Sequence, residues 1–172
     1  MSFMDRLFSF EGRLRRRDWW LINIGLGVVN YIITQVIAPM VLGAEGRVQM
    51  TPGSFMPTYP MPLLIVMLVM AAIIFWPYLA LAVKRTHDRD QSARVNIGLI
   101  LFNTALSWAG IVVMSLTGEL TLFWVSAAAG TIIGLYLLIT LGFLDGTQGP
   151  NRFGPSPKGL AGQSASVANE FS

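Results

Sequence analysis

The chain has 172 residues, of which 53% are hydrophobic and only 12% are charged. A soluble domain carries about a quarter charged residues, and a fold of this length cannot hide so much apolar surface from water. The composition therefore excludes an ordinary soluble domain and favours a membrane protein. The sequence contains no cysteine, which excludes a disulfide framework, a thiolate metal site and a cysteine nucleophile.

Residues 1–18 form a basic, amphipathic N-terminal segment that we expect to be cytoplasmic. Phe3, Leu7 and Phe10 have the spacing of one helix face, which predicts a short helix lying on the membrane surface. The arginines of residues 13–17 follow it. This basic cluster either recognises anionic lipid head groups or acts as a topology signal next to two interfacial tryptophans. The two interpretations are compatible.

Residues 19–145 form the predicted transmembrane domain. It contains four long runs without any Asp, Glu, Lys or Arg. Each run offers roughly 22 residues of apolar helix, which spans a hydrocarbon core of about 30 Å. Continuous apolar stretches such as residues 63–69 exclude the alternating strands of a membrane barrel. The sequence therefore predicts an all-α integral membrane bundle of four transmembrane helices, at about 20–42, 61–83, 95–117 and 121–144.

The basic residues predict the orientation of the bundle. Eleven of the 12 lie on one side of the predicted spans: Arg6, Arg13, Arg15, Arg16, Arg17, Lys84, Arg85, Arg89, Arg94, Arg152 and Lys158. The other side has only Arg47. Positive residues accumulate in cytoplasmic loops, so both termini are expected to be cytoplasmic. We expect residues 146–172 to form a cytoplasmic Gly/Pro-rich end that leads into a disordered tail.

The loop between the second and third predicted helices is the densest polar stretch of the chain, and it holds the only histidine. His87 lies beside Asp88 and Asp90, which suggests a metal site or an acid–base pair. One histidine with two carboxylates is only part of a ligand set, however, and adjacent helical residues do not face each other. We favour a short hairpin whose aspartates pair with Arg85, Arg89 or the N-terminal arginines.

Three motifs lie at the expected cytoplasmic ends of the helices. They are Phe10-x-Gly12-Arg13-x-Arg15-Arg16-x-Asp18-Trp19-Trp20, Lys84-Arg85-x-His87-Asp88 and Gly149-Pro150-Asn151-Arg152-Phe153-Gly154-Pro155. Together they resemble the bacterial family called domain of unknown function 805, and the resemblance extends from about Phe8 to Lys158. The chain departs from the family pattern directly after Asp88, where a small-residue turn and a tryptophan are replaced. The resemblance implies a small inner-membrane protein, and it implies no particular activity.

Four asparagines lie inside the predicted spans. Asn23 and Asn30 are seven residues apart on the first helix, and Asn96 and Asn103 repeat that spacing on the third. Each pair shares one helix face. The four side chains either line a polar track between the two helices or form interhelical amide hydrogen bonds, and we favour the hydrogen bonds.

The sequence favours a non-enzymatic membrane protein that contacts anionic lipids or a protein partner through its cytoplasmic rim. The residues predicted to form an ion-pair or interaction cluster there are Arg13, Arg16, Arg85, His87, Asp88, Asp145 and Arg152. No catalytic, metal-binding or cofactor-binding residue is predicted, and no cofactor is expected. A small-residue face at Gly130 and Gly134 suits close helix packing within one chain or in a homo-oligomer.

Two other functions stay open at this point. A small solute channel or transporter would use the asparagine track, although the predicted spans lack the ionisable residues that coupled transporters usually carry. An enzyme acting on lipid head groups would use His87, Asp88 and Asp145, but no nucleophile accompanies them. Nucleic-acid binding is not expected, because the basic residues are spread along the ends of helices close to the lipid.

Overall fold

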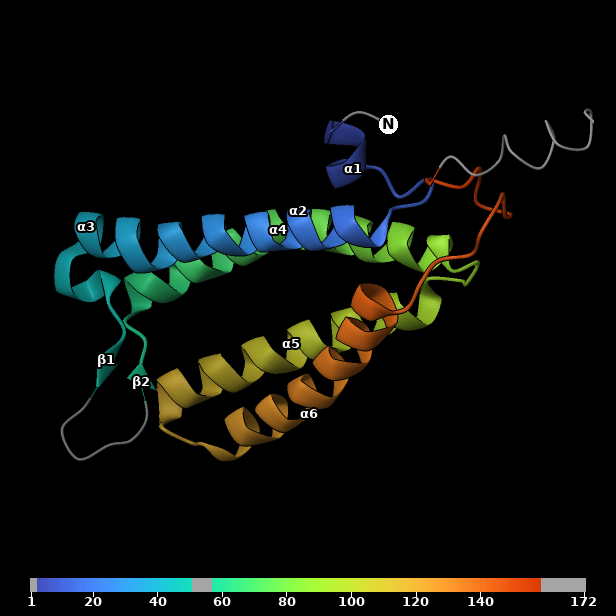
Figure 1. Cartoon of the computed structure of the whole chain (residues 1–172). Coiled ribbons are helices and arrows are strands. Elements are labelled where there is room, and N and C mark those ends of the chain that lie inside the picture. The colour runs from blue at the N-terminus through green and yellow to red at the C-terminus, as the bar shows by residue number, and fades with distance from the viewer. Residues whose placement is uncertain (1–2, 51–56, 159–172) are drawn as a thin grey trace, which may run out of the picture.

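The computed structural model describes residues 3–50 and 57–158, and these residues are mainly helical (Figure 1). In chain order the elements are α1 (Phe3–Phe8), α2 (Arg16–Ile32), the π-helical turn η1 (Ile33–Ile37), α3 (Ala38–Leu42), the 3-10 turn η2 (Gly43–Gly46), β1 (Gln49–Met50), β2 (Pro57–Thr58), α4 (Met61–Asp88), α5 (Arg94–Thr117), α6 (Thr121–Leu137) and the π-helical turn η3 (Leu138–Phe143). The predicted disordered tail falls largely on residues 159–172, which lie outside the described residues.

Among the described residues, four helical stretches are long and apolar enough to cross a membrane. They are Arg16–Gly46, Met61–Asp88, Arg94–Thr117 and Thr121–Phe143. The prediction of an all-α bundle of four membrane-spanning helices is confirmed. The second helix continues to Asp88, five residues beyond the predicted end at 83. It can do so because the charged side chains of its last turns find partners in other segments.

The four long helices form two pairs (Figure 1). One pair is α2 beside α4, and the other is α5 beside α6. The pairs come together at the end where α4 leads into α5, and they diverge toward the end that carries β1 and β2. The two helices of the second pair pack tightly at Gly110, where an added Cβ would lie 2.5 Å from the Ser126 hydroxyl oxygen. Small residues therefore let α5 and α6 approach each other.

The two ends of the bundle differ in their connections. At the end with the strands, β1 and β2 form a short antiparallel hairpin in which Gln49 is opposite Thr58. At the same end, α5 stops at Gly118, whose φ of 75° is the left-handed conformation that glycine adopts readily. At the other end lie the α4–α5 connection and the chain after η3, and α1 lies beside the bundle toward this end (Figure 1). We call this the basic end, because the arginines of residues 13–17 and 85–94 lie there.

The buried apolar core also lies toward the basic end. Its members are Leu14, Trp19, Leu81, Ala82, Ile100, Leu137 and Leu141. Elsewhere large apolar side chains are exposed on the outer faces of the helices, for example Leu21 at 61% and Ile132 at 71%. Such surfaces suit contact with lipid chains, which satisfy apolar groups as well as a protein core does.

Candidate functional site at the basic end

Three charged side chains are buried together at the basic end, and we call Arg13, Arg85 and Asp88 the arginine–aspartate cluster. Their side chains are 2%, 0% and 5% exposed, respectively. The Arg13 guanidinium lies 3.0 Å from one carboxylate oxygen of Asp88, and the Arg85 guanidinium lies 2.5 Å from the other. The carboxylate thus joins the N-terminal segment to the last turn of α4, which is far away in the sequence.

Two buried cations face one buried anion in this cluster, so other groups must compensate the second positive charge. Backbone carbonyl oxygens provide this compensation. The acceptors are Thr147 at 2.6 Å, Gly149 at 2.7 Å and Gly154 at 3.3 Å for Arg13, and Leu141 at 2.7 Å and Leu144 for Arg85. The cluster therefore fastens the segment after η3 to the N-terminal segment and to α4.

The carboxyl end of the α6–η3 helix is capped by side chains from two other helices. The last carbonyl groups of a helix have no partner inside it, and they carry the negative end of the helix dipole. Arg16, Trp20, Arg85 and Arg89 donate hydrogen bonds to the carbonyl oxygens of Phe143, Gly142, Leu141 and Thr140 at 3.0, 3.0, 2.7 and 3.3 Å, respectively. Three arginines thus donate to carbonyl groups that lack a partner within the helix, and their positive charges interact favourably with the negative end of the helix dipole.

The segment after η3 folds tightly over the end of α4. The Thr147 amide donates to the Asp88 carbonyl oxygen at 2.8 Å, and the Asn151 side chain donates to the His87 carbonyl oxygen at 2.9 Å. Gly146 has no room for a side chain, because an added Cβ would collide with the Asp88 carboxylate. The Gly/Pro-rich motif is therefore a cap on the arginine–aspartate cluster.

His87 is an aromatic partner here. Its ring stacks on Phe153 with the ring centroids 3.8 Å apart and an interplanar angle of 7°. The Arg152 guanidinium lies 4.8 Å from the centroid of the same phenyl ring and pairs with Asp90 at 3.2 Å. His87 is thus placed between helix and cap, and its carboxylate neighbours are engaged by arginines.

Lys84 fixes the amphipathic helix α1 to the bundle. Its side chain is fully buried and donates to the carbonyl oxygens of Asp5 and Arg6, both at 2.6 Å. The Trp76 indole donates to the Phe8 carbonyl oxygen at 3.2 Å. Helix α1 therefore lies against the side of α4.

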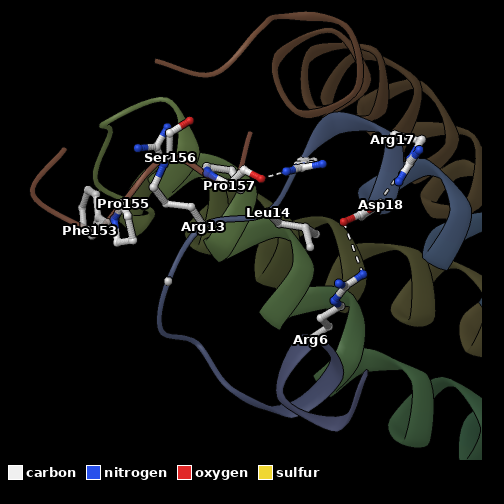
Figure 2. A pocket seen from close by; sticks show the side chains of 11 residues that line it. Arg6, Arg13, Leu14, Arg17, Asp18, Phe153, Pro155, Ser156 and Pro157 are labelled. Carbon is white, nitrogen blue, oxygen red and sulfur yellow. Dashed lines mark hydrogen bonds and ion pairs between the residues drawn. The ribbon is translucent and has the colours of Figure 1, made fainter. Parts of the chain in front are cut away.

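A pocket of about 510 Å³ opens beside the arginine–aspartate cluster (Figure 2). It is lined by Arg6, Gly12, Arg13, Leu14, Arg15, Arg17, Asp18, Phe153, Pro155, Ser156 and Pro157. Arg6 and Arg17 both point toward Asp18, at 3.3 and 3.6 Å. Arg15 donates to the carbonyl oxygen of Pro157 across the pocket. Four arginines and one aspartate give this pocket, which we call the arginine pocket, a positive charge.

The seven residues predicted as one cluster lie at the same end of the bundle, in three groups. Arg13, Arg85 and Asp88 are buried together, as described above. Arg16 pairs with Asp145 at 3.6 Å on the surface, where their side chains are 48% and 63% exposed. His87 stacks on Phe153 of the cap, and Arg152 of the cap pairs with Asp90. Asp88 and Asp145 therefore do not share one site.

The four asparagines have four different surroundings. Asn23 donates to the Trp19 carbonyl oxygen of its own helix at 2.8 Å. Asn96 donates to the Thr86 hydroxyl of α4 at 2.8 Å. Asn103 faces Gly130 of α6, and Asn30 lines a cavity between α2, α4 and α5. Within the described part of the chain, Asn96 alone of the four forms the interhelical hydrogen bond that was favoured. The structure does not bring the four side chains to a common path.

Sequence reasoning missed two kinds of participant. The carbonyl acceptors of Arg13 and Arg85 are backbone groups, which carry no side-chain signal. Arg6 was noted for its charge only and Asp18 only as part of the first motif, and no spacing rule connects residues 12 positions apart across a turn. Among the described residues, no group of three or more His, Asp or Glu side chains is placed to hold a metal ion.

The four apolar helices and the charged network at one end define a multi-pass membrane protein of the small helical class. The chain belongs to the family described as "Protein of unknown function (DUF805)", whose model matches residues 7–155. This match covers all four spans and all three motifs, so the resemblance inferred from the motifs is confirmed.

Several curated proteins of Escherichia coli strain K12 are similar over most of their length. "Uncharacterized protein YiiR" is 31% identical over 160 residues, which cover 90% of this chain and 89% of that protein. "Inner membrane protein YhaI" is 27% identical, with 92% and 93% covered, and "Inner membrane protein YhaH" is 24% identical, with 92% and 94% covered. No solved structure matches the chain significantly. With these relatives and four spans, the chain is an inner-membrane protein.

Proposed function

We propose that this chain is a non-enzymatic inner-membrane protein that binds an anionic lipid head group in the arginine pocket. The observation that carries the proposal is the excess of arginine over acidic side chains in a pocket of about 510 Å³ beside the first transmembrane helix. Arginine presents a planar set of donors that matches the oxygens of a phosphate group. The basic end faces the cytoplasm, as the distribution of lysine and arginine indicates.

The arginines at the basic end differ in burial and in their partners, and this difference supports the proposal. Arg13 and Arg85 are buried and bonded to Asp88 and to backbone carbonyl oxygens, so they hold the pocket wall in place. Arg17 is 77% exposed and shares its aspartate with Arg6. Its guanidinium is therefore free to turn toward a phosphate. A rigid wall with exposed, partly neutralised arginines in front suits reversible capture of an anion.

The expected head group is a phosphodiester, because Arg17 and Asp18 of the pocket belong to the first turn of α2, where Trp19 and Trp20 follow in the sequence and favour the membrane–water boundary by residue type. Free phosphate carries the same chemistry, so an experiment must separate the two. The full chain in phosphatidylcholine nanodiscs would be titrated with short-chain phosphatidylglycerol and, separately, with inorganic phosphate. Tighter binding of the lipid supports the proposal, whereas binding of phosphate alone overturns it.

A pair of variants tests the position of the site. At about 1 kcal/mol for each basic residue near a lipid surface, the double substitution Arg15→Gln and Arg17→Gln is expected to weaken phosphatidylglycerol binding about 30-fold. The matched control is Arg47→Gln with Arg94→Gln, which removes the same charge from residues outside the pocket. Equal weakening by both pairs would show diffuse attraction and would contradict a defined site.

The orientation has its own test, because the natural chain has no cysteine. Arg47→Cys places a single thiol in the connection before β1, and Arg94→Cys places one at the exposed first residue of α5, at the opposite end of the bundle. A membrane-impermeant maleimide added to intact spheroplasts is expected to label the first variant only. Labelling of the second variant alone would place the arginine pocket outside the cytoplasm and overturn the proposed orientation.

A further inference from the structure

A second cavity, of about 690 Å³, lies between α2, α4 and α5 and is separate from the arginine pocket. Among the residues that line it are Asn30, Ala71 and Thr104. Each lies within about two residues of the centre of its charge-free run (20–42, 61–83 or 95–117), and such a run spans a hydrocarbon core of about 30 Å. The cavity therefore lies near the middle of the membrane, where the two helix pairs begin to diverge. We call it the midplane cavity.

Polar side chains without partners gather around the midplane cavity. In the described part of the chain, none of the following side chains makes a hydrogen bond: Asn30, Gln35, Tyr78, Thr104 and Trp108. Polar groups in hydrocarbon are costly unless they are hydrogen-bonded, because no water is present to pair with them. Gln35 is exposed and the other four are half-buried, so five polar groups from three helices around one cavity are available to pair with a polar occupant.

The backbone of α2 is also irregular at this cavity. The π-helical turn η1 contains Thr34 and Gln35, and both residues line the cavity. Pro39 gives the turn a local cause, because proline has no amide hydrogen for the carbonyl of residue 35. Single π-helical turns inside α-helices occur frequently at functional sites. Here the turn presents the Gln35 carboxamide to the cavity.

The lining restricts the chemistry of an occupant. None of the lining residues is Asp, Glu, Lys, Arg or His, so a neutral molecule is expected, because an ion would have no counter-charge. Aromatic rings of Phe75, Tyr78 and Trp108 form much of the wall, which suits a flat or apolar group. The indole, phenol, hydroxyl and carboxamide groups all offer hydrogen-bond donors, which require acceptor oxygens on the ligand. The volume is within the usual range of small-molecule sites, about 300–1,000 Å³.

We propose that the midplane cavity binds a neutral, membrane-soluble molecule whose head carries carbonyl or hydroxyl oxygens. The ring of a prenylated quinone and the ester head of a diacylglycerol both have this chemistry. In either case the oxygens accept hydrogen bonds from Asn30, Tyr78 and Trp108, and the apolar chain leaves between the diverging helix pairs. This site is independent of the proposed head-group site at the basic end.

The experiment uses the full chain in phosphatidylcholine nanodiscs and two probes, decyl-benzoquinone and dioctanoylglycerol. Bound probe is counted by native mass spectrometry, and the shift in unfolding temperature is measured across a titration, since a ligand that binds the folded state stabilises it. Binding of the quinone alone assigns the cavity to a ring, and binding of the glyceride alone assigns it to an ester head. Binding of both supports the shared oxygen chemistry. Absence of both at roughly 100 µM, corresponding to about −5.5 kcal/mol, overturns the proposal.

Matched variants locate the site. Asn30→Leu removes an unpaired carboxamide from the cavity and is expected to weaken probe binding at least tenfold. Asn23→Leu is the control, because it makes the same change on the same helix at a residue whose amide bonds to its own backbone. Tyr78→Phe is a milder second variant that retains the ring and removes one hydroxyl. Equal affinity of Asn30→Leu, Tyr78→Phe and the control would place the probe elsewhere and refute the site.

Discussion

The charged side chains of the arginine–aspartate cluster and the neutral polar side chains around the midplane cavity differ in their hydrogen-bond partners. At the basic end, Arg13 and Arg85 find Asp88 and five backbone carbonyls within the chain. Around the midplane cavity, carboxamide, phenol and indole groups have no partner among the described residues. The charged groups of the cluster thus lie where the chain supplies their partners, whereas the neutral polar groups that line the cavity near the middle of the membrane have none among the described residues.

This difference indicates that the arginine–aspartate cluster serves mainly the stability of the fold and that the midplane cavity serves mainly ligand binding. A buried polar network whose members satisfy one another fixes one arrangement of the chain, and removal of one member is expensive. Unpaired neutral groups contribute little to stability, and their hydrogen-bonding capacity is available to a ligand. We therefore expect substitutions at the basic end to change mainly the free energy of unfolding, and substitutions at the midplane cavity to change mainly ligand binding.

The largest expected effect on the free energy of unfolding is that of Asp88→Asn, which removes the carboxylate shared by Arg13 and Arg85. The change keeps the shape of the side chain but leaves two buried guanidinium groups without a counter-charge. Removal of one partner from a buried ion pair costs about 3–5 kcal/mol. Denaturant unfolding of the purified chain, followed by helical circular dichroism, should show this loss.

The control for Asp88→Asn is Asp145→Asn, at a carboxylate that is 63% exposed and pairs with Arg16 and Lys158 at the surface. Exposed pairs contribute about 0–1 kcal/mol, so the free energy of unfolding should hardly change. If both variants unfold at the same denaturant concentration, the arginine–aspartate cluster does not stabilise the basic end as argued.

Gly146→Ala tests the contact between the cap and the cluster without removing any charge. An added Cβ would collide with the Asp88 carboxylate, so the cap must shift and its hydrogen bonds must lengthen. Such overpacking typically costs about 1–3 kcal/mol. Gly134→Ala is the matched control, because nothing lies within 4 Å of a Cβ added there. A loss of stability in the control alone would contradict the packing described here.

The fold could be predicted because its main determinant, the length of each charge-free apolar run, can be read directly from the sequence. Charge-free runs long enough to cross the membrane define the four spans without any knowledge of packing. The extension of α4 to Asp88 could not be predicted in this way. Helix formation at Lys84 and Arg85 depends on acceptors from the N-terminal segment and from η3, which are distant in sequence.

The candidate sites show the same limit. The Gly/Pro-rich motif was found from its residues, but its role as a cap depends on backbone carbonyls, which every residue has. For the asparagines, a spacing of seven predicts one shared face of α5 for Asn96 and Asn103, but Asn96 bonds to Thr86 of α4 and Asn103 lies against Gly130 of α6. The face meets α4 at one depth and α6 at the other, because the helix pairs diverge. Relative tilt is a tertiary property that spacing on one helix does not contain.

The smallest expected effect on the free energy of unfolding is that of Asn96→Leu, which tests a neutral polar contact at the basic end. Asn96 donates to the Thr86 hydroxyl at 2.8 Å, the interhelical bond between α4 and α5, and such bonds contribute about 0.6 kcal/mol in membrane bundles. Its carbonyl oxygen, however, is buried without a partner, and the substitution removes that unsatisfied group as well. The Thr86 hydroxyl keeps its own bond to the Ala82 carbonyl oxygen.

Because these two effects have opposite signs, we expect the free energy of unfolding of Asn96→Leu to stay within about 0.5 kcal/mol of the natural chain. The measurement is the denaturant unfolding used for Asp88→Asn, with Thr86→Val as a second variant that removes the acceptor instead. Thr86→Val should be the more destabilising of the two, since it leaves the whole Asn96 carboxamide buried and unpaired. A loss from Asn96→Leu as large as that from Asp88→Asn would mean that neutral polar contacts also hold the basic end together.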